Sequence, residues 1–417
     1  MTVVIALCLL LLVAYLFEFY SEKINVPTVM VLLLAGFLLR EIITYFKIPF
    51  PDLFFLLPAL GNLGLLLIVL EAALSIKLNR GHGKLLLQTV SLALASIIIL
   101  SFILALALRA AHPTVSFREL LLMAAVFAGT SSAVAISSSK HLPPASRTFV
   151  IYESSFSDIL SIMFFNFLLW NQTLNANAFY VALSQLIITA IISAVSIYFL
   201  FFLMQRIEHE IKFIPIILLV ILIYSVSELM HLPGLIFILF FGLFLNNYDR
   251  LQSLPWLKKM FIKENPGEVT RFKDLVVEFT FLIKSIFFLV FGFAVSRREI
   301  LNLSDLLKAL AIVTFIFGLR WLLLKLMRIK LDRVLYFAPR GLITILLFVT
   351  LQEKGLAPFL SRGMVFQVVF LSCLVMVIGN LAGKKQEEKI ETRAAENHQV
   401  AWKSSSRAGS GLSSYNI

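Results

Sequence analysis

Apolar blocks close to 20 residues long recur along this chain, and they restrict what it can fold into. Residues 85–109 form one such block, in which Arg109 at the very end is the only charged residue. About 20 apolar residues are needed for a helix to cross a bilayer. An average soluble domain is about 25% charged, whereas only 14% of the residues here are charged. We therefore predict an all-α polytopic membrane protein.

The blocks predict about 13 transmembrane helices. The predicted spans are roughly 2–18, 27–44, 55–76, 85–109, 119–138, 147–170, 178–204, 213–230, 232–246, 274–295, 305–327, 336–352 and 363–381. The first span has no basic region before it and no small-residue cleavage site, which predicts a retained helix rather than a signal peptide. The polar residues 382–417 are predicted to be a disordered cytosolic tail.

The formal net charge of +12 would suit a nucleic-acid partner, but its distribution argues against one. With the N-terminus placed outside, Lys and Arg concentrate in the loops on the inner side, even when the tail is left out. The positive-inside rule then places the N-terminus outside and the C-terminus in the cytosol. Short loops and the lack of transit features indicate a multi-pass protein of a bacterial cell (inner) membrane. The expected partner is the lipid bilayer, and no nucleic acid.

The stretch from Val126 to Trp170 contains two predicted spans that are each interrupted by polar residues. The first has the run Gly129-Thr130-Ser131-Ser132, and the second has Glu153 and Asp158. An ionisable side chain at membrane depth costs roughly 2.5–3.5 kcal/mol and marks a functional site by default. The hydroxyl run has two nearly even interpretations. It is either a broken helix that turns backbone carbonyls toward a cavity or a small-residue face that packs closely against another helix.

Spacing within the span 147–170 separates its two carboxylates. Ser154, Asp158 and Ser161 are four and three residues apart, so they share one helical face. Glu153 lies about 140° around the helix from Asp158. This predicts a structural role for one carboxylate and a cavity-facing role, beside hydroxyl oxygens, for the other. Because burial disfavours the charged form of a carboxyl group, a proton and a cation can compete for Asp158.

The C-terminal half contains a second interrupted span. The remaining ionisable residues at membrane depth are Glu71, Lys284, Arg320 and Arg340. Pro339 and Gly341 disrupt the helix predicted over 336–352. One interrupted span in each half is typical of an inverted-repeat transporter with its site where the breaks meet. Glu71 has an alternative interpretation as a snorkelling or interface glutamate.

These residues resemble the sodium/proton exchanger branch of the monovalent cation:proton antiporter superfamily. Four features carry the resemblance: Leu70-Glu71-Ala-Ala-Leu, Glu153-Ser-Ser-Phe-Ser-Asp158, Arg320, and Pro339-Arg340-Gly341-Leu-Ile-Thr. The resemblance implies a thirteen-helix homodimer of the inverted-repeat antiporter fold, with two discontinuous helices and a transmembrane antiporter domain over 1–381. It also implies that a core (about 85–170 and 305–381) slides like an elevator against dimerisation or scaffold helices (about 2–76 and 213–295).

The same resemblance implies a role for each site residue. Asp158 would bind the cation, Na⁺ or K⁺, transiently and in turn with the proton. The residues expected around it as ligands or close neighbours are Ser154, Thr130, Ser131, Ser157 and Glu71. Glu153 and Arg320 would form a structural ion pair, and Lys284 and Arg340 would be buried bases. Neither a cofactor nor an enzymatic activity is expected.

Two departures from the family pattern affect the predicted site. The family's Thr-Asp-Pro is here Thr130-Ser131-Ser132, so one carboxylate is missing, and the Asn or Asp before the key aspartate is here Ser157. With one acid fewer, the site can prefer a different ion, bind more weakly or depend on Glu71. A single titrating Asp158 favours one-for-one, electroneutral exchange, unless Lys284 also releases a proton.

Three functions compete at this point. The first is a secondary active transporter that exchanges Na⁺ or K⁺ for H⁺ and serves pH homeostasis. The second is a transport-inactive sensor or assembly subunit that keeps the antiporter fold, which would tolerate Asp158→Asn. The third is an intramembrane hydrolase that uses a serine with His141 or Asp158, but the Gly-x-Ser-x-Gly elbow of such enzymes does not occur. The sequence favours the first.

Overall fold

The computed structural model describes residues 8, 11–12, 14–16, 26–47, 53–76, 83–171, 175–206, 213–247, 266–329 and 333–382. Within these ranges, all regular structure is helical. Most of the first predicted span and residues 383–417 of the predicted tail lie outside the described residues. The prediction of an all-α fold is confirmed for the part that is described.

Eight helices in the described ranges are long and apolar enough to cross a membrane. They are α2 (Thr28–Tyr45), α3 (Leu57–Ala73) with the preceding turn η1 (Phe54–Leu56), α4 (Gly83–Ala111), α7 (Pro144–Trp170), α8 (Ala176–Arg206), α12 (Pro266–Ala294), α14 (Leu303–Leu326) and the last helix, Arg362–Ala382. The shorter apolar helices are α9 (Phe213–Leu229), α10 (Gly234–Asn246) and α15 (Leu342–Glu353). A short helix, α13 (Arg297–Ile300), precedes α14. This is the pattern of a multi-pass membrane protein.

Two of the predicted spans are interrupted. The span predicted over 119–138 consists of α5 (Phe117–Ala125) and α6 (Ser132–Ser138), separated by non-helical residues 126–131, and α6 continues into the turn η3 (Ser139–His141). The span predicted over 336–352 starts with the turn η5 (Arg333–Tyr336) and becomes helical again only at α15, after residues 337–341. Glycine and serine are poor helix formers, and proline disfavours helix in the residue before it. The chain therefore leaves the helix where its composition favours other conformations.

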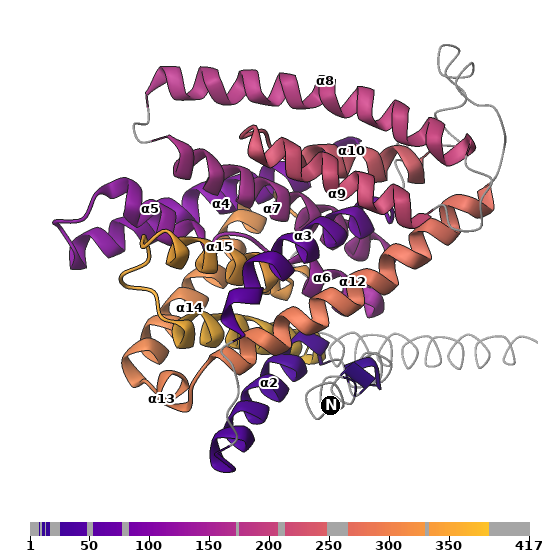
Figure 1. Ribbon diagram of the computed structural model, residues 1–417. Helices are drawn as coiled ribbons and strands as arrows, with labels where there is room; N and C mark the ends of the chain where they lie inside the picture. Colours follow the sequence, from indigo (N-terminus) through magenta and orange to yellow (C-terminus); the bar gives the residue numbers. More distant parts are fainter. Residues whose placement is uncertain are drawn as a thin grey trace, which may run out of the picture.

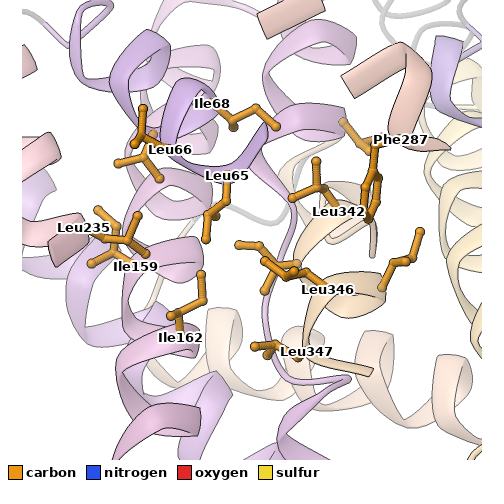
Figure 2. Packing of buried hydrophobic residues seen from close by; sticks show 14 of the residues in the cluster. Leu65, Leu66, Ile68, Ile159, Ile162, Leu235, Phe287, Leu342, Leu346 and Leu347 are labelled. Carbon is orange, nitrogen blue, oxygen red and sulfur yellow. The ribbon is translucent and has the colours of Figure 1, made fainter. Parts of the chain in front are cut away.

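The helix α3 lies in the middle of the hydrophobic core. Figure 1 shows it between α8, at one edge of the bundle, and the long α12 on the other side. Side chains of α3 pack toward α7, α10, α12 and α15 (Figure 2). The labelled residues of this cluster are Leu65, Leu66, Ile68, Ile159, Ile162, Leu235, Phe287, Leu342, Leu346 and Leu347. Because α3 contacts both α7 and α15, the helix that carries Glu71 is packed against the site helices.

The boundary of α12 differs from the prediction. The predicted span began at residue 274 and placed residues 247–273 in a loop, but α12 begins at Pro266. Its first two turns carry charged residues such as Glu268 and Arg271. Hydropathy detects only the apolar part of a helix, whereas the backbone hydrogen bonds continue into the polar turns. Residues 248–265 of that predicted loop lie outside the described residues.

Two glycines allow the backbones of α2 and α12 to approach closely. A Cβ atom added to Gly36 would collide with the carbonyl oxygen of Leu289, and one added to Gly292 would collide with the carbonyl oxygen of Leu33. Since backbone atoms cannot move aside as the end of a side chain can, the two helices must separate to admit even a methyl group. Small residues commonly permit such packing between membrane helices.

We expect Gly36→Ala to destabilise the protein by about 1–3 kcal/mol, the usual cost of overpacking. The matched control is Gly318→Ala, because Gly318 is an exposed residue within α14 and a Cβ there meets no atom within 4 Å. Thermal unfolding of the detergent-purified variants measures the difference. Equal melting temperatures for the two variants would contradict the close contact.

Candidate functional site

The two interrupted segments lie against each other. The backbone N–H of Ser131 donates to the carbonyl of Pro339 over 2.9 Å. The Ser131 hydroxyl lies against Gly341, where a Cβ would be only 2.5 Å from its Oγ atom. The break between α5 and α6 and the break before α15 therefore meet at one point inside the bundle.

Backbone groups that the first break frees from helical hydrogen bonds find partners from other segments. The Thr130 N–H donates to Ser157 Oγ over 2.9 Å, and the Ser132 N–H donates to Asp158 Oδ2 over 3.1 Å. The carbonyl of Gly129 accepts a hydrogen bond of 2.8 Å from Arg340 Nη1. Polar backbone groups at membrane depth must be satisfied within the protein, so these side chains make the break tolerable.

Asp158, on α7, lies against the first residue of α6 and is 2% exposed. Its Oδ2 atom accepts hydrogen bonds from both the backbone N–H and the hydroxyl of Ser132. Its Oδ1 atom is buried, and no hydrogen-bond partner for it occurs among the described residues. One carboxylate oxygen is therefore held by the break, while the other remains available to a small ligand.

Arg340 supplies the positive charge at the same crossing. Its Nη1 atom donates to Gly129 O and, over 3.1 Å, to Thr130 Oγ1. The backbone N–H of Arg340 donates to Ser372 Oγ over 2.9 Å, which fixes the residue to the last helix. A cation is favourable near the carbonyl end of a helix, and here the guanidinium lies just beyond the end of α5.

Glu153 and Arg320 form an ion pair away from Asp158. Both side chains are nearly inaccessible, and the guanidinium meets the carboxylate through two hydrogen bonds of 2.5 and 2.7 Å. Arg320 also donates to the carbonyl of Val334, in η5. Bidentate pairs of this kind have the geometry that makes a charge pair strong. The pair links α7 and α14 to the segment that leads into the second break.

A cavity of about 530 Å³ reaches the break from one side. Its lining residues are Tyr15, Ile68, Glu71, Ala72, Ser75, Ser132, Ala133, Ile136, Ser137, Lys140, Arg147, Val277, Glu278, Phe281 and Lys284. Ser132, which donates to Asp158, is therefore also in the cavity wall. Glu71 and Lys284 lie on the same cavity, so acids and bases both face the space beside the site.

A second cavity of about 240 Å³ lies farther along α7, toward Trp170. It is mainly apolar and includes Ile162, one turn beyond Asp158, with Asn166 and Glu228 among its polar groups. Ile162 also belongs to the buried cluster in which α7 packs against α3 and α15 (Figure 2). The structure thus has a large cavity on the Lys140 side of the site and a smaller one on the Trp170 side.

The structure gives different surroundings to the predicted site residues. Ser154 donates back to the Val150 carbonyl of its own helix over 2.7 Å, and Ser131 contacts the second break. Ser132, which sequence reasoning did not select as a site residue, bonds to Asp158 directly. The signal that could have identified it is its place as the first residue of a helix after a break, where a free N–H is expected.

Within the described residues, no group of three or more His, Cys, Asp and Glu side chains comes together in a way that could hold a metal ion. The side-chain groups around Asp158 are mainly hydroxyls, such as those of Ser132 and Ser157.

The structure is similar to two solved structures of MjNhaP1, a sodium proton antiporter from Methanocaldococcus jannaschii. One is the structure at pH 8 and the other is from a 3D EM map; both give a TM-score of 0.66 and 18% sequence identity. Each match covers 92% of this chain, and 97% and 96% of the respective MjNhaP1 chains. No curated protein matches the chain in sequence.

The family described as "Sodium/hydrogen exchanger, transmembrane" matches residues 8–381 of the chain. This range contains both breaks, the paired charges and Asp158. The predicted resemblance to sodium/proton exchangers is therefore confirmed, and the solved structures support the antiporter fold. The chain belongs to the sodium/hydrogen exchanger family.

Proposed function

We propose that this protein exchanges a monovalent cation, Na⁺ or K⁺, for H⁺, and that Asp158 binds the two in turn. The observation that carries the proposal is the state of the Asp158 carboxylate. It is buried where two helix breaks meet, one oxygen is held by Ser132, and the other has no partner among the described residues. Ser132, which is hydrogen-bonded to Asp158, also lines the large cavity.

Coupling follows from the cost of an uncompensated buried charge. A buried carboxylate that is not bonded to an opposite charge is strongly unfavourable, by several kcal/mol, so Asp158 must carry either a proton or a cation when the site is closed. A protein that changes its accessible side only in these two states exchanges one ion for the other. With one titrating carboxylate, one cation replaces one proton and the exchange is electroneutral. A proton released by Lys284 in the same cycle would make it electrogenic.

Contacts between two distant parts of the chain support a mobile core made of residues 85–170 and 305–381. Three kinds of contact join these two parts of the chain. They are the Glu153–Arg320 ion pair, the hydrogen bonds of Arg340 to Gly129 and Thr130, and the ring stacking of His112 on Phe359, whose centroids are 3.7 Å apart. A unit held together in this way can move as one body against α2, α3, α9, α10 and α12, as an elevator mechanism in a homodimer requires.

The charge distribution supports an assignment of the two cavities. Lys140 and Arg147 lie at the larger cavity, and the positive-inside rule places such residues on the cytosolic side. The larger cavity would then open toward the cytosol, and the smaller one would lie toward the outside. On this assignment the structure is in an inward-facing state.

Dye dequenching in inside-out vesicles tests the proposed function. Vesicles from antiporter-deficient cells are given a proton gradient, and Na⁺, Li⁺ and K⁺ are added in turn at acid and at alkaline pH. We expect at least one of these cations to dissipate the gradient in vesicles that contain the protein and not in empty-vector vesicles. Silence with every cation, while the protein is present in the membrane, would favour the transport-inactive sensor.

Ser132→Ala is expected to slow exchange by roughly tenfold or more, since a hydrogen bond to a charged group contributes about 1.5–3 kcal/mol. The variant loses the hydroxyl that donates to Asp158 but keeps the backbone N–H. The matched control is Ser137→Ala. Ser137 lines the same cavity, but its hydroxyl donates to carbonyls of its own helix. Initial rates of dye dequenching give the comparison, and equal rates would remove Ser132 from the mechanism.

A further inference from the structure

Two buried oxygen atoms on α7 lack a hydrogen-bond partner in the described part of the chain. They are Asp158 Oδ1 and Ser161 Oγ. Both residues are almost completely buried, at 2% and 1% exposure. A buried polar atom without a partner is rare in native proteins and calls for an explanation, such as a water molecule or an ion.

The other serines near Asp158 on this helix do have partners. Ser154 and Ser155 donate to the carbonyls of Val150 and Ile151 in their own helix, each over 2.7 Å. Ser157 accepts from the N–H of Thr130. A hydroxyl in a helix easily bonds back to a carbonyl three or four residues earlier, so the unpaired state of Ser161 is distinctive among them.

Ser161 and Asp158 lie on the same face of α7, one turn apart. Residues at this spacing are neighbours on a helix surface. The Ser161 side chain faces the break between α5 and α6, since a Cβ on Gly129 would collide with both Oγ and Cβ of Ser161. The Ser161 hydroxyl and the Asp158 carboxylate therefore both lie against the break between α5 and α6. The absence of a side chain at Gly129 leaves room for Ser161.

From this geometry we propose that Ser161 is a cation ligand, and that the transported ion binds between Asp158 Oδ1 and Ser161 Oγ. The inference rests on the proposed function. Hard monovalent cations bind to carboxylate and hydroxyl oxygens, and this pair offers one charged and one neutral oxygen. The ion lies on the Oδ1 side of Asp158, whereas Ser132 holds Oδ2 from the cavity side. A neutral ligand on the same helical face as the carboxylate restricts the space for the ion, so Ser161 contributes to ion preference.

The test separates ion binding from turnover. Dye dequenching at fixed pH gives the half-saturating cation concentration and the maximal rate for Na⁺, Li⁺ and K⁺. We expect Ser161→Ala to raise the half-saturating concentration of the preferred ion by roughly tenfold, the equivalent of about 1.4 kcal/mol, with little change in maximal rate. The loss should be unequal among the three ions. Because the hydroxyl makes no hydrogen bond in the described chain, its removal should not lower the melting temperature.

Ser155→Ala is the matched control, because Ser155 is a buried serine on the same helix whose hydroxyl is bonded to its own backbone. If Ser161→Ala fails to accumulate, Ser161→Cys replaces it, because cysteine has a similar size but offers a soft sulfur. The same rise in half-saturating concentration is expected. Half-saturating concentrations within twofold of wild type, as in Ser155→Ala, would overturn the inference. Asp158→Asn is assayed in parallel. If Asp158→Asn is inactive and Ser161→Ala is unaffected, the proposed function stands and only the role of Ser161 is wrong. If Asp158→Asn is active, the proposed function itself is wrong.

Discussion

Asp158→Asn will abolish cation-driven proton movement while the protein still folds. Asparagine has nearly the same shape, and its carbonyl oxygen can accept both hydrogen bonds that Ser132 donates. It cannot carry a charge, so it cannot hold a proton and a cation in turn. Removing a buried charge also removes its desolvation cost, which is several kcal/mol per ion. We therefore expect exchange at background level together with an unchanged or higher melting temperature.

The control for this variant is Asp305→Asn. Asp305 is a buried carboxylate on α14 that accepts a 2.6 Å hydrogen bond from Ser361, and it is not part of the two breaks. The same dye assay and the same thermal unfolding apply to both variants. Exchange that survives in Asp158→Asn would show that another group, such as Glu71, carries the ions.

Breaking the Glu153–Arg320 pair is expected to have the largest effect on stability. Truncating either partner leaves the other charge buried and unpaired, which costs about 3–5 kcal/mol. Arg320→Ala also removes two donors from the carbonyl of Val334, next to the second break. We expect little folded Arg320→Ala or Glu153→Gln protein by size-exclusion chromatography in detergent, and a sharply lower melting temperature for what remains.

Two further variants distinguish the effect of a buried ion pair from that of an exposed ion pair. The double replacement Glu153→Leu with Arg320→Leu should recover much of the lost stability, because apolar residues can replace a buried pair at small cost. Lys308→Ala breaks the Lys308–Asp305 pair, in which Lys308 is 56% exposed, and should cost at most about 1 kcal/mol. A loss in Lys308→Ala as large as in Arg320→Ala would contradict the special role of burial.

Helical geometry was enough to predict much of the fold from the sequence. The blocks of apolar residues predicted the membrane helices because burial in lipid leaves few other choices for the backbone. The Gly-and-hydroxyl run at Gly129 and the proline and glycine at 339 and 341 marked the places where the structure leaves the helix. The five-residue separation of Glu153 and Asp158 predicted different directions for the two side chains, which bond to α14 and α6 respectively.

The identity of each hydroxyl's partner could not be read from the sequence. Thr130, Ser131 and Ser132 are chemically alike and adjacent, yet their N–H groups donate to three different acceptors, Ser157, Pro339 and Asp158. The N–H that reaches the Asp158 carboxylate is the one at the residue where α6 begins. That starting point is fixed by contacts with the second break, such as the hydrogen bond from Arg340 to Gly129. The serines on α7 raise the same difficulty. Ser154 and Ser161 share the helical face of Asp158, but Ser154 bonds to its own helix and Ser161 faces the break.

The missing carboxylate at Ser131 has a structural counterpart. The Ser131 side chain lies against Gly341, and its N–H is bonded to Pro339. A larger acidic side chain at this position would have to displace the second break or turn elsewhere. The serine therefore fits a close crossing of the two breaks, and it leaves Asp158 as the acid directly bonded there.

Purified protein in liposomes gives the most direct test of coupling through Asp158. A pH-sensitive dye inside the liposomes reports proton movement while a gradient of the preferred cation is imposed, first in one direction and then in the other. Our account predicts that protons move opposite to the cation, that the sign reverses with the gradient, and that Asp158→Asn liposomes show neither effect. Wild-type liposomes that stay silent for Na⁺, Li⁺ and K⁺ at acid and alkaline pH, with folded protein confirmed, would contradict it and leave the transport-inactive sensor as the function of this fold.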